Sequence, residues 1–363
     1  MAAPKFNPLV VKQIRRETPD TVSVVFNVPN NLAKNYQYIA GQNLTLKTTI
    51  SGEEIRRSYS ICSAPHEAEL RVAVKKIPSG IFSTFANEML KEGDVLDVME
   101  PSGSFYTPLH PDNSNQYVGF AAGSGITPII SLIKSTLYTE PQSQFILFLG
   151  NRNTESIIFR EELEQLKNKY LTRLVVHHII SGENVGAHLF RGRITGEKCA
   201  VFAFKFFDAA TVNAYFLCGP ESMINEVSNT LQELRVPKNR IHFELFTASS
   251  AAAAKEAFAQ NMAANTTNDL ESQITVILDG NAFDFPLKSS GQSILEAAQK
   301  FGAELPYACK GGVCCTCKAR VLQGEVVMEV NYALEPEEVE QGYVLTCQSH
   351  PKTPKVVLSF DEN

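Results

Sequence analysis

The chain has 363 residues, more than a single hydrophobic core usually serves, so two or three domains are expected. Its composition, 44% hydrophobic and 20% charged, is that of a globular protein and excludes a collagen-like or wholly disordered chain. The formal net charge is −6, and the acidic excess lies in residues 271–363, which carry 13 acidic and 7 basic side chains. A nucleic-acid-binding protein needs a basic stripe, so we exclude that class and expect any charged partner of the C-terminal part to be basic.

The sequence also bears on membranes and location. A transmembrane helix needs about 18 consecutive apolar residues, and the longest apolar stretch, 117–133, is interrupted by glycine and proline. The N-terminal residues lack the apolar region of a secretory signal. We therefore expect no membrane span and a cytoplasmic location.

Alternation of apolar and polar residues predicts short strands in the N-terminal part, at 8–28, 44–49, 56–61, 70–76 and 95–100. Glycine and proline separate them, and one helix is expected at 83–90. The pattern predicts an antiparallel β-barrel domain over residues 1–109.

From Tyr117 the pattern changes to apolar strands that alternate with helices. Strands are expected at 117–123, 145–150, 174–180 and 214–219, with helices at 126–137, 159–169 and 221–234. This alternation predicts an α/β domain with a doubly wound parallel sheet, residues 110–247, beginning at the polar segment 110–116.

Residues 248–273 are rich in Ala, Ser, Asn and Thr and are interpreted as a linker, partly helical at 251–260. A third domain, 274–363, is expected to begin with two strands joined by a turn at Asp279-Gly280. A short helix at 293–301 should follow, with Ser293 and Glu296 as a capping box.

Four of the eight cysteines share one spacing, C-x4-C-x2-C followed by a distant fourth, which is the plant-type [2Fe-2S] pattern: Cys309, Cys314, Cys317 and Cys347. Small residues between them, Gly311, Gly312 and Thr316, would let backbone N–H groups turn toward the cluster sulfurs. A four-cysteine zinc site is the alternative, although zinc sites prefer paired C-x2-C units. Cys315 is interpreted as a buried filler. Residues 274–360 resemble a plant-type ferredoxin domain, here of the α+β, β-grasp type.

Three segments of the barrel resemble the flavin site of the ferredoxin-NADP reductase superfamily. The motif Arg57-Ser58-Tyr59-Ser60 would place Arg57 on the FAD diphosphate, Tyr59 against the isoalloxazine and Ser60 near the flavin N5. The other two are a strand that passes the flavin, Ala73, Val74 and Lys75, and a glycine turn that opens a helix toward the diphosphate, Gly80, Ile81, Phe82, Ser83 and Thr84. A barrel corner with a capped helix is the alternative interpretation.

The second domain carries the corresponding nicotinamide motifs. Gly123-Ser124-Gly125-Ile126-Thr127-Pro128 follows a strand and opens a helix, as a dinucleotide-binding loop does. In the resemblance, Thr127 and the turn Cys218-Gly219-Pro220 frame the nicotinamide, and Glu244 and Phe246 lie near the reacting edge of the flavin. The catalytic candidates are Ser60, Thr127, Cys218 and Glu244.

Arg152 follows the second strand of this domain, where an acidic residue would hold a ribose 2′-hydroxyl and an arginine a 2′-phosphate. No Asp or Glu precedes Glu155 in this segment, which favours NADPH over NADH.

Taken together, the whole chain resembles the reductase components of oxygenases, and among these it is most similar to the family serving phenylacetyl-CoA oxygenase (epoxidase). The resemblance implies an enzyme that passes electrons from NAD(P)H through FAD and a [2Fe-2S] cluster to an oxygenase. Other diiron or Rieske oxygenases, hydroxylases or desaturases are alternative partners. Two further hypotheses stay open, a redox-sensing flavoprotein and an electron carrier without catalysis of its own.

Overall fold

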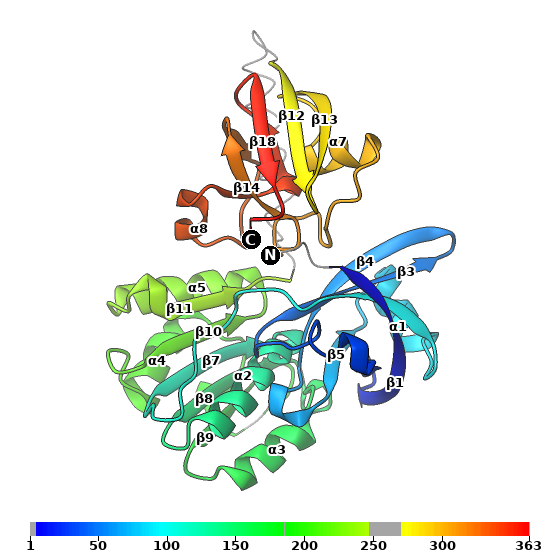
Figure 1. Cartoon of the computed structure of the whole chain (residues 1–363). Coiled ribbons are helices and arrows are strands. Elements are labelled where there is room, and N and C mark those ends of the chain that lie inside the picture. The colour runs from blue at the N-terminus through cyan, green and yellow to red at the C-terminus, as the bar shows by residue number, and fades with distance from the viewer. Residues whose placement is uncertain (1–4, 185, 247–269, 363) are drawn as a thin grey trace. The chain divides into compact units, whose positions relative to one another are not determined.

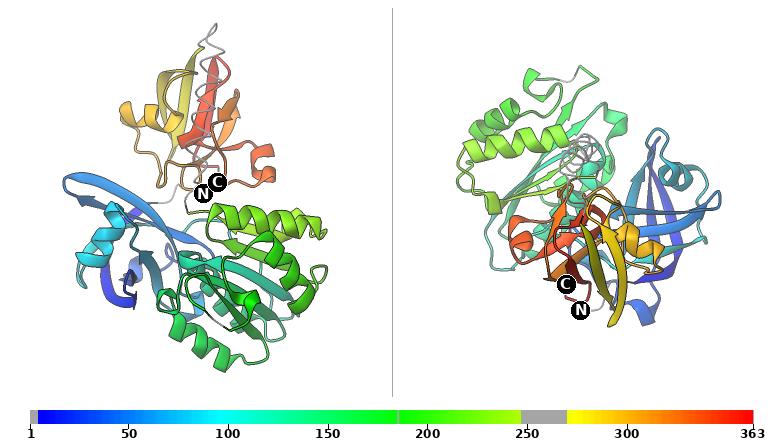
Figure 2. Two further views of the ribbon diagram at one scale, coloured as in Figure 1. Left: turned by 180° about the vertical axis from the view of Figure 1, so that it is seen from behind. Right: turned by 90° about the horizontal axis from the view of Figure 1, so that it is seen from above.

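A computed structural model describes residues 5–184, 186–246 and 270–362 of the chain (Figures 1 and 2). It divides into two compact units: one comprises Asn7–Glu244, and the other is formed mainly by the part that follows Leu245. The helical stretch expected at 251–260 lies outside the described residues. No helix in the described part of the chain is both long and apolar enough to span a membrane.

The N-terminal domain is the expected antiparallel barrel. Its six strands run in the order β4-β3-β6-β1-β2-β5: β1 Phe6–Thr18, β2 Thr21–Asn27, β3 Asn43–Ile50, β4 Glu53–Ser60, β5 Leu70–Lys75 and β6 Val95–Met99. The sheet closes where Ile61, just after β4, bridges Val72 of β5. Helix α1, Ile81–Glu88, begins two residues before the expected start at Ser83.

The second domain has a five-stranded sheet in the order β11-β10-β7-β8-β9, and each neighbouring pair is parallel. Its strands are β7 Gln116–Ala122, β8 Gln144–Asn151, β9 Leu174–Ile180, β10 Ala214–Cys218 and β11 Ile241–Glu244. Helices α2, Ile126–Thr139, and α3, Arg160–Lys169, cover one face, whereas α4, Gly196–Phe206, and α5, Glu221–Glu233, cover the other (Figure 1). The doubly wound sheet is confirmed.

Helix α4 was not predicted. Its helical period is obscured in the sequence by exposed apolar residues such as Phe204, although the buried Cys199 and Phe202 lie three positions apart on one face. Phe202 of α4 is buried and stacks on Phe148 of β8 with 4.4 Å between ring centroids. The buried face of this helix therefore packs against the sheet.

The barrel and the α/β domain share one hydrophobic cluster. Four buried residues of the barrel and its exit segment pack with the core of the α/β domain: Ala40, Cys62, Ala73 and Phe105. In β5 the side chains alternate, because Ala73 belongs to this shared cluster while Val72 and Val74 belong to the barrel core. The two domains are thus joined by a packed apolar interface.

The C-terminal domain is a mixed sheet in the order β13-β12-β18-β14-β16 with a separate β15–β17 pair. The strands are β12 Glu271–Leu278, β13 Asn281–Lys288, β14 Lys318–Gln323, β15 Val326–Met328, β16 Tyr343–Leu345, β17 Ser349–Pro351 and β18 Lys355–Ser359, with helices α7 Ile294–Lys300 and α8 Pro336–Glu340. Strand β12 begins at Glu271, earlier than the predicted domain start at Ile274, because Gln273 already pairs with both Pro286 and Lys355.

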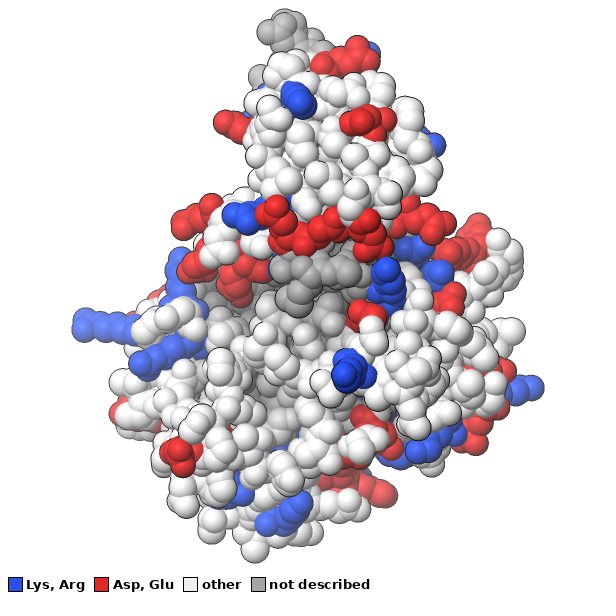
Figure 3. All heavy atoms as spheres, in the orientation of Figure 1, with Lys and Arg blue, Asp and Glu red and all other residues white. Residues whose placement is uncertain are grey.

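Two local predictions in this domain fare differently. The Asp279-Gly280 turn is confirmed, since both residues have positive φ, 50° and 75°, between antiparallel strands. The capping box is half formed: Ser293 Oγ accepts from the Glu296 N–H at 3.4 Å. On the face shown in Figure 3, acidic side chains gather at one end of this domain.

Candidate flavin, nicotinamide and iron-sulfur sites

One candidate site lies between β7 and β10, where the strand order of the parallel sheet reverses. Strands β7 and β10 are neighbours, and the chain leaves their carboxyl ends through the Gly123–Gly125 turn and through Gly219. Ligands bind in open α/β sheets at this position. A Cβ on Gly125 would lie 2.0 Å from the Cys218 carbonyl oxygen, so glycine is required for the two loops to approach.

The loop ahead of α2 suits a dinucleotide. Neither Gly125 at the N-cap of α2 nor Ala122 ahead of the turn makes a side-chain cap, which leaves backbone N–H groups for a ligand. Thr127 is buried, and its hydroxyl donates to the Ser124 carbonyl at 3.0 Å. The hydroxyl therefore stabilises the Gly123–Thr127 loop, and Thr127 would contact a nicotinamide through its methyl group.

Three of the four catalytic candidates meet at this edge. The parallel register sets Cys218 of β10 opposite Glu244 of β11, and the Ser60 hydroxyl at the end of β4 donates to Glu244 Oε2 at 2.8 Å. Burial raises the pKa of Glu244 to about 7, and the Ser60 hydrogen bond opposes this rise. Burial, and then the Glu244 charge, raise the pKa of Cys218 well above its ordinary value, so its thiol stays protonated.

Glu244 can therefore exchange a proton near neutral pH, and the contact with Ser60 joins the barrel to the α/β domain. Cys218, by contrast, is a neutral thiol that shapes the pocket. Phe246, which lies beyond β11, is 38% exposed.

The flavin motif of β4 is divided between the two faces of the strand. Tyr59 lies beside Phe82 with ring centroids 5.5 Å apart, next to the barrel core, whereas Ser60 turns to Glu244. Arg57 is exposed, and its Nη1 donates to the Arg56 carbonyl at 2.7 Å. A flavin contacting Tyr59 and Ser60 together would pass over the end of β4.

The other two segments predicted to bind flavin, 73–75 and 80–84, would contact it mainly through backbone atoms. The side chains of Val74 and Phe82 are buried in the barrel core, so these residues would meet a flavin through their backbone, and Ala73 packs on the α/β domain. Lys75 lies 3.5 Å from Asp20, and Ser83 Oγ bridges the Gly80 carbonyl and the Ile77 N–H. Helix α1 has Gly80 at its N-cap and no side-chain cap, so its first N–H groups suit a diphosphate. Ile81 and Thr84 lie in this first turn.

The edge near Arg152 holds a carboxylate that the sequence did not reveal. Arg152 is exposed just after β8, and its carbonyl accepts from the Gly182 N–H at 2.6 Å, which brings the loop after β9 alongside. Glu183 of that loop accepts from the Thr154 hydroxyl at 2.7 Å and from the Thr154 N–H at 3.0 Å. These bonds lower the pKa of Glu183, so a carboxylate and an arginine stand at the same edge.

The four predicted cluster ligands come together as two pairs. Cys314 Sγ donates to Cys309 Sγ at 3.1 Å, and Cys317 interacts in the same way with Cys347. In the described part of the chain, no three metal-ligating side chains converge on a single point. Two thiol pairs suit two irons with two thiolates each.

Backbone N–H groups of the loop point at the sulfurs, as the small residues predicted. The Gly311 N–H donates to Cys309 Sγ at 3.3 Å. The hydrogen bond from Cys314, joined by N–H groups of this loop, lowers the pKa of Cys309 to about 6 despite burial. Only one of the two glycines is sterically required: Gly312 has φ +74° and a Cβ there would lie 2.9 Å from Val330, whereas one on Gly311 would meet nothing closer than 3.7 Å.

Gln348 is a residue of this site that the sequence reasoning missed. It is fully buried, and its Nε2 donates to the Lys310 carbonyl at 3.1 Å and to Cys347 Sγ at 3.4 Å. It therefore ties the loop of the first three cysteines to the fourth. Its only signal in the sequence was its position directly after Cys347. Cys315 donates to the Ala333 carbonyl at 3.2 Å, away from the pairs.

Family models match all three domains: an oxidoreductase FAD-binding domain over residues 8–106, an oxidoreductase NAD-binding domain over 120–229 and a 2Fe-2S iron-sulfur cluster binding domain over 276–352. The chain is 42% identical over 361 residues to a subunit of the 1,2-phenylacetyl-CoA epoxidase of Escherichia coli (strain K12), with 98% of each chain covered. The chain belongs to this family of oxygenase reductase components.

The chain also matches more distant proteins over nearly its whole length. The chain is 34% identical to the ferredoxin reductase component of 3-ketosteroid-9-alpha-monooxygenase from Rhodococcus rhodochrous, covering 97% of this chain and 96% of the relative. The solved structure of phthalate dioxygenase reductase shares the fold, with a TM-score of 0.59, 23% identity and 98% of both chains covered. The protein is thus an NAD(P)H-dependent FAD and [2Fe-2S] oxidoreductase that delivers electrons to an oxygenase.

Proposed function

We propose that this reductase serves a phenylacetyl-CoA epoxidase. The observation that carries the proposal is the 42% identity over nearly the whole of both chains to a subunit of that enzyme. The protein would act in the cytoplasm, whose reducing conditions keep thiols free for metal ligation. The proposed domains are 1–109, 110–247 and 274–363, with residues 248–273 as the linker except where β12 begins at Glu271.

The site geometry supports specific roles. Arg57 and the first turn of α1 would hold the FAD diphosphate, and Tyr59 and the backbone of β5 would flank the ring. The Gly123–Thr127 loop and the turn at Cys218 would hold the nicotinamide. Ser60 and Glu244 would stand at the reacting edge, where a carboxyl with a pKa of about 7 can hold or release a proton.

When bound, the FAD accepts a hydride and the cluster carries single electrons. The residues of the chain position these groups. For the cluster, the two cysteine pairs would each hold one iron, and the loop N–H groups would stabilise the negative charge on the sulfurs.

NADPH is the proposed coenzyme because Arg152 follows β8, as an arginine that holds a 2′-phosphate would. The Glu183 carboxylate at the same edge opposes a phosphate and suits a ribose 2′-hydroxyl, so NADH is the alternative.

The partner is tested by reconstitution of the full-length reductase with the oxygenase component of a phenylacetyl-CoA epoxidase. We expect NADPH consumption that depends on both phenylacetyl-CoA and oxygenase, with epoxide formed in proportion. Ferricyanide reduction without oxygenase serves as the control for an intact flavin. Rapid ferricyanide reduction without coupled epoxidation would contradict this partner. Coupling to a Rieske monooxygenase would then be measured.

A further inference from the structure

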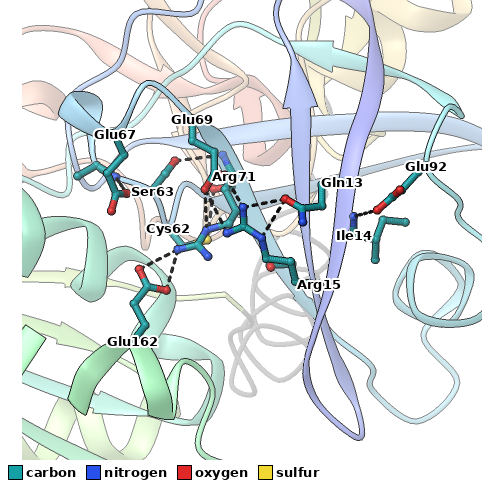
Figure 4. Close-up of polar contacts among 12 residues, drawn as sticks. Gln13, Ile14, Arg15, Cys62, Ser63, Glu67, Glu69, Arg71, Glu92 and Glu162 are labelled. Atoms are coloured by element: carbon teal, nitrogen blue, oxygen red, sulfur yellow. Dashed lines mark hydrogen bonds and ion pairs between the residues drawn. The ribbon is translucent and has the colours of Figure 1, made fainter. Parts of the chain in front are cut away.

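A network of charged side chains with two buried cations joins the barrel and the α/β domain, and Figure 4 shows its contact between Arg71 and Glu162. Glu162 of α3 accepts from Arg71 Nη2 of β5 at 2.8 and 2.9 Å and from Lys134 Nζ of α2 at 2.8 Å. Lys134 also donates to Glu67 of the barrel at 2.8 Å. The interdomain ion network, as we name these four residues, thus joins two residues from each domain.

The two cations of the network are almost completely removed from water. The side chain of Lys134 is 3% exposed and that of Arg71 is 5% exposed. Burial alone would raise the pKa of Glu162, but Lys134 and then Arg71 outweigh it, and the pKa is lowered. Glu162 therefore remains charged. The buried cations depend on their carboxylate partners, because an unpaired charge away from water is strongly disfavoured.

The barrel end of the network is itself fixed. Arg71 Nε lies 3.4 Å from Glu69 Oε2, and Arg15 donates to the other oxygen of Glu69 at 2.6 Å. The Arg71 guanidinium also stands over the Phe159 ring, 5.3 Å from its centroid. These contacts fix the orientation of the Arg71 guanidinium.

The elements that carry the network also carry the two redox sites. Arg71 and Ala73 share one face of β5, the strand proposed to pass the flavin. Lys134 lies seven residues after Thr127 on α2, hence on the same helix face as the residue proposed to meet the nicotinamide. One rigid strand and one rigid helix therefore connect the network to the hydride acceptor and the hydride donor.

We infer that the interdomain ion network is a positioning device for hydride transfer: it fixes the nicotinamide loop relative to the flavin strand. The inference rests on the proposed function of the two sites. The transfer moves two electrons and a proton together as hydride from the nicotinamide C4 to the flavin N5, giving NAD(P)+ and reduced flavin. The rate depends steeply on the distance between these atoms, and a misplacement of about 1 Å can cost roughly 100-fold.

The apolar part of the interface cannot supply this precision by itself. Apolar contacts are non-directional, whereas charge-assisted hydrogen bonds fix distance and angle. A buried ion network is also no better for stability than well-packed apolar side chains of the same volume. The interdomain ion network therefore contributes fixed distances and angles between the two domains, which apolar side chains at the same positions would not provide.

The test is single-turnover flavin reduction in the full-length, FAD-loaded protein at saturating NADPH. Glu162→Gln keeps the shape of the side chain and removes its charge. We expect the reduction rate to fall about 10- to 100-fold and the nicotinamide-flavin charge-transfer absorbance to weaken, while the Kd for NADPH changes by less than about twofold. The matched control is Glu164→Gln on the same helix, whose exposed carboxylate pairs with Lys167 at 3.2 Å. It should reduce flavin at the wild-type rate.

A second variant separates positioning from stability. In the double variant Lys134→Met with Glu162→Gln the two lost charges compensate, so the thermal midpoint should recover relative to Glu162→Gln alone, while the reduction rate stays as low as in Glu162→Gln. The double variant also carries the test if Glu162→Gln does not fold.

Wild-type reduction rates in either variant, an equal loss in Glu164→Gln, or a rate that recovers together with stability would overturn the inference. Failure of NADPH to reduce the wild-type flavin would instead refute the proposed function.

Discussion

Replacing Ser60 with alanine should raise the pKa of Glu244 and move the pH dependence of flavin reduction. Burial raises the pKa of Glu244 to about 7, and the hydrogen bond from Ser60 is the contact that opposes this rise. The hydroxyl stabilises the charged carboxylate more than the neutral acid, so its loss favours protonation. At pH 7 the variant should hold Glu244 mostly neutral.

The magnitude follows from the contact. A hydrogen bond to a charged group contributes about 1.5 to 3 kcal/mol, and 1.36 kcal/mol corresponds to one pH unit. Because Ser60 can also pair with the neutral carboxyl, the lower end applies, and the inflection should move upward by about one pH unit. Single-turnover flavin reduction from pH 5.5 to 9 measures it, and Glu244→Gln is the control in which the inflection should vanish.

The same group makes stability depend on pH. Because the pKa of Glu244 is raised from 4.5 to about 7, its contribution to folding is fully present below pH 4.5 and is lost as the pH rises through 7. Relative to Glu244→Gln, the wild type should lose up to roughly 3 kcal/mol of unfolding free energy between these limits. If the flavin-reduction rate of Ser60→Ala keeps its inflection near pH 7, the hydrogen bond from Ser60 does not set the pKa of Glu244.

Four further predictions concern the other sites. Serine at any predicted ligand should abolish bound iron and acid-labile sulfide, whereas Cys315→Ser should keep both; normal iron in Cys347→Ser would contradict the ligand set. Gln348→Leu removes an N–H···S bond to Cys347, which stabilises the reduced cluster more than the oxidised one because the reduced cluster is more negative. A spectroscopic redox titration should therefore show a lower midpoint potential, by roughly 40 mV for each kcal/mol of stabilisation lost. Arg152→Ala should raise the KM for NADPH about 10- to 100-fold while sparing NADH, and equal effects would exclude Arg152 as the discriminator. Changing all four glutamates of residues 335–340 to glutamine should slow reduction of a basic protein acceptor at about 0.05 M salt and matter little at 1 M, where the Debye length is about 3 Å; a rate indifferent to salt would exclude electrostatic steering.

Features set by short stretches of the chain could be predicted from the sequence. The order of the three domains, the doubly wound sheet and the Asp279-Gly280 turn follow from local patterns, since strand and helix periods are visible within a few residues. The cluster ligands were predictable because three of them share one loop, whose N–H groups must approach the sulfurs. Even there, no local pattern distinguishes the two glycines, because the difference depends on Val330 packing against Gly312 but not against Gly311.

Contacts between distant segments were decided only by the tertiary structure. Ser60 meets Glu244 because the carboxyl end of β11 lies beside the end of β4, and the two residues are 184 positions apart in the chain. Glu183 comes close to the Arg152 segment because the parallel strands β8 and β9 end side by side. Arg71, Lys134 and Glu162 look singly like ordinary surface charges, and only the packing of the barrel on α2 and α3 buries them together. A local pattern records which side chains a segment offers, whereas the partner of each depends on how strands and helices pack, which no stretch of sequence contains by itself.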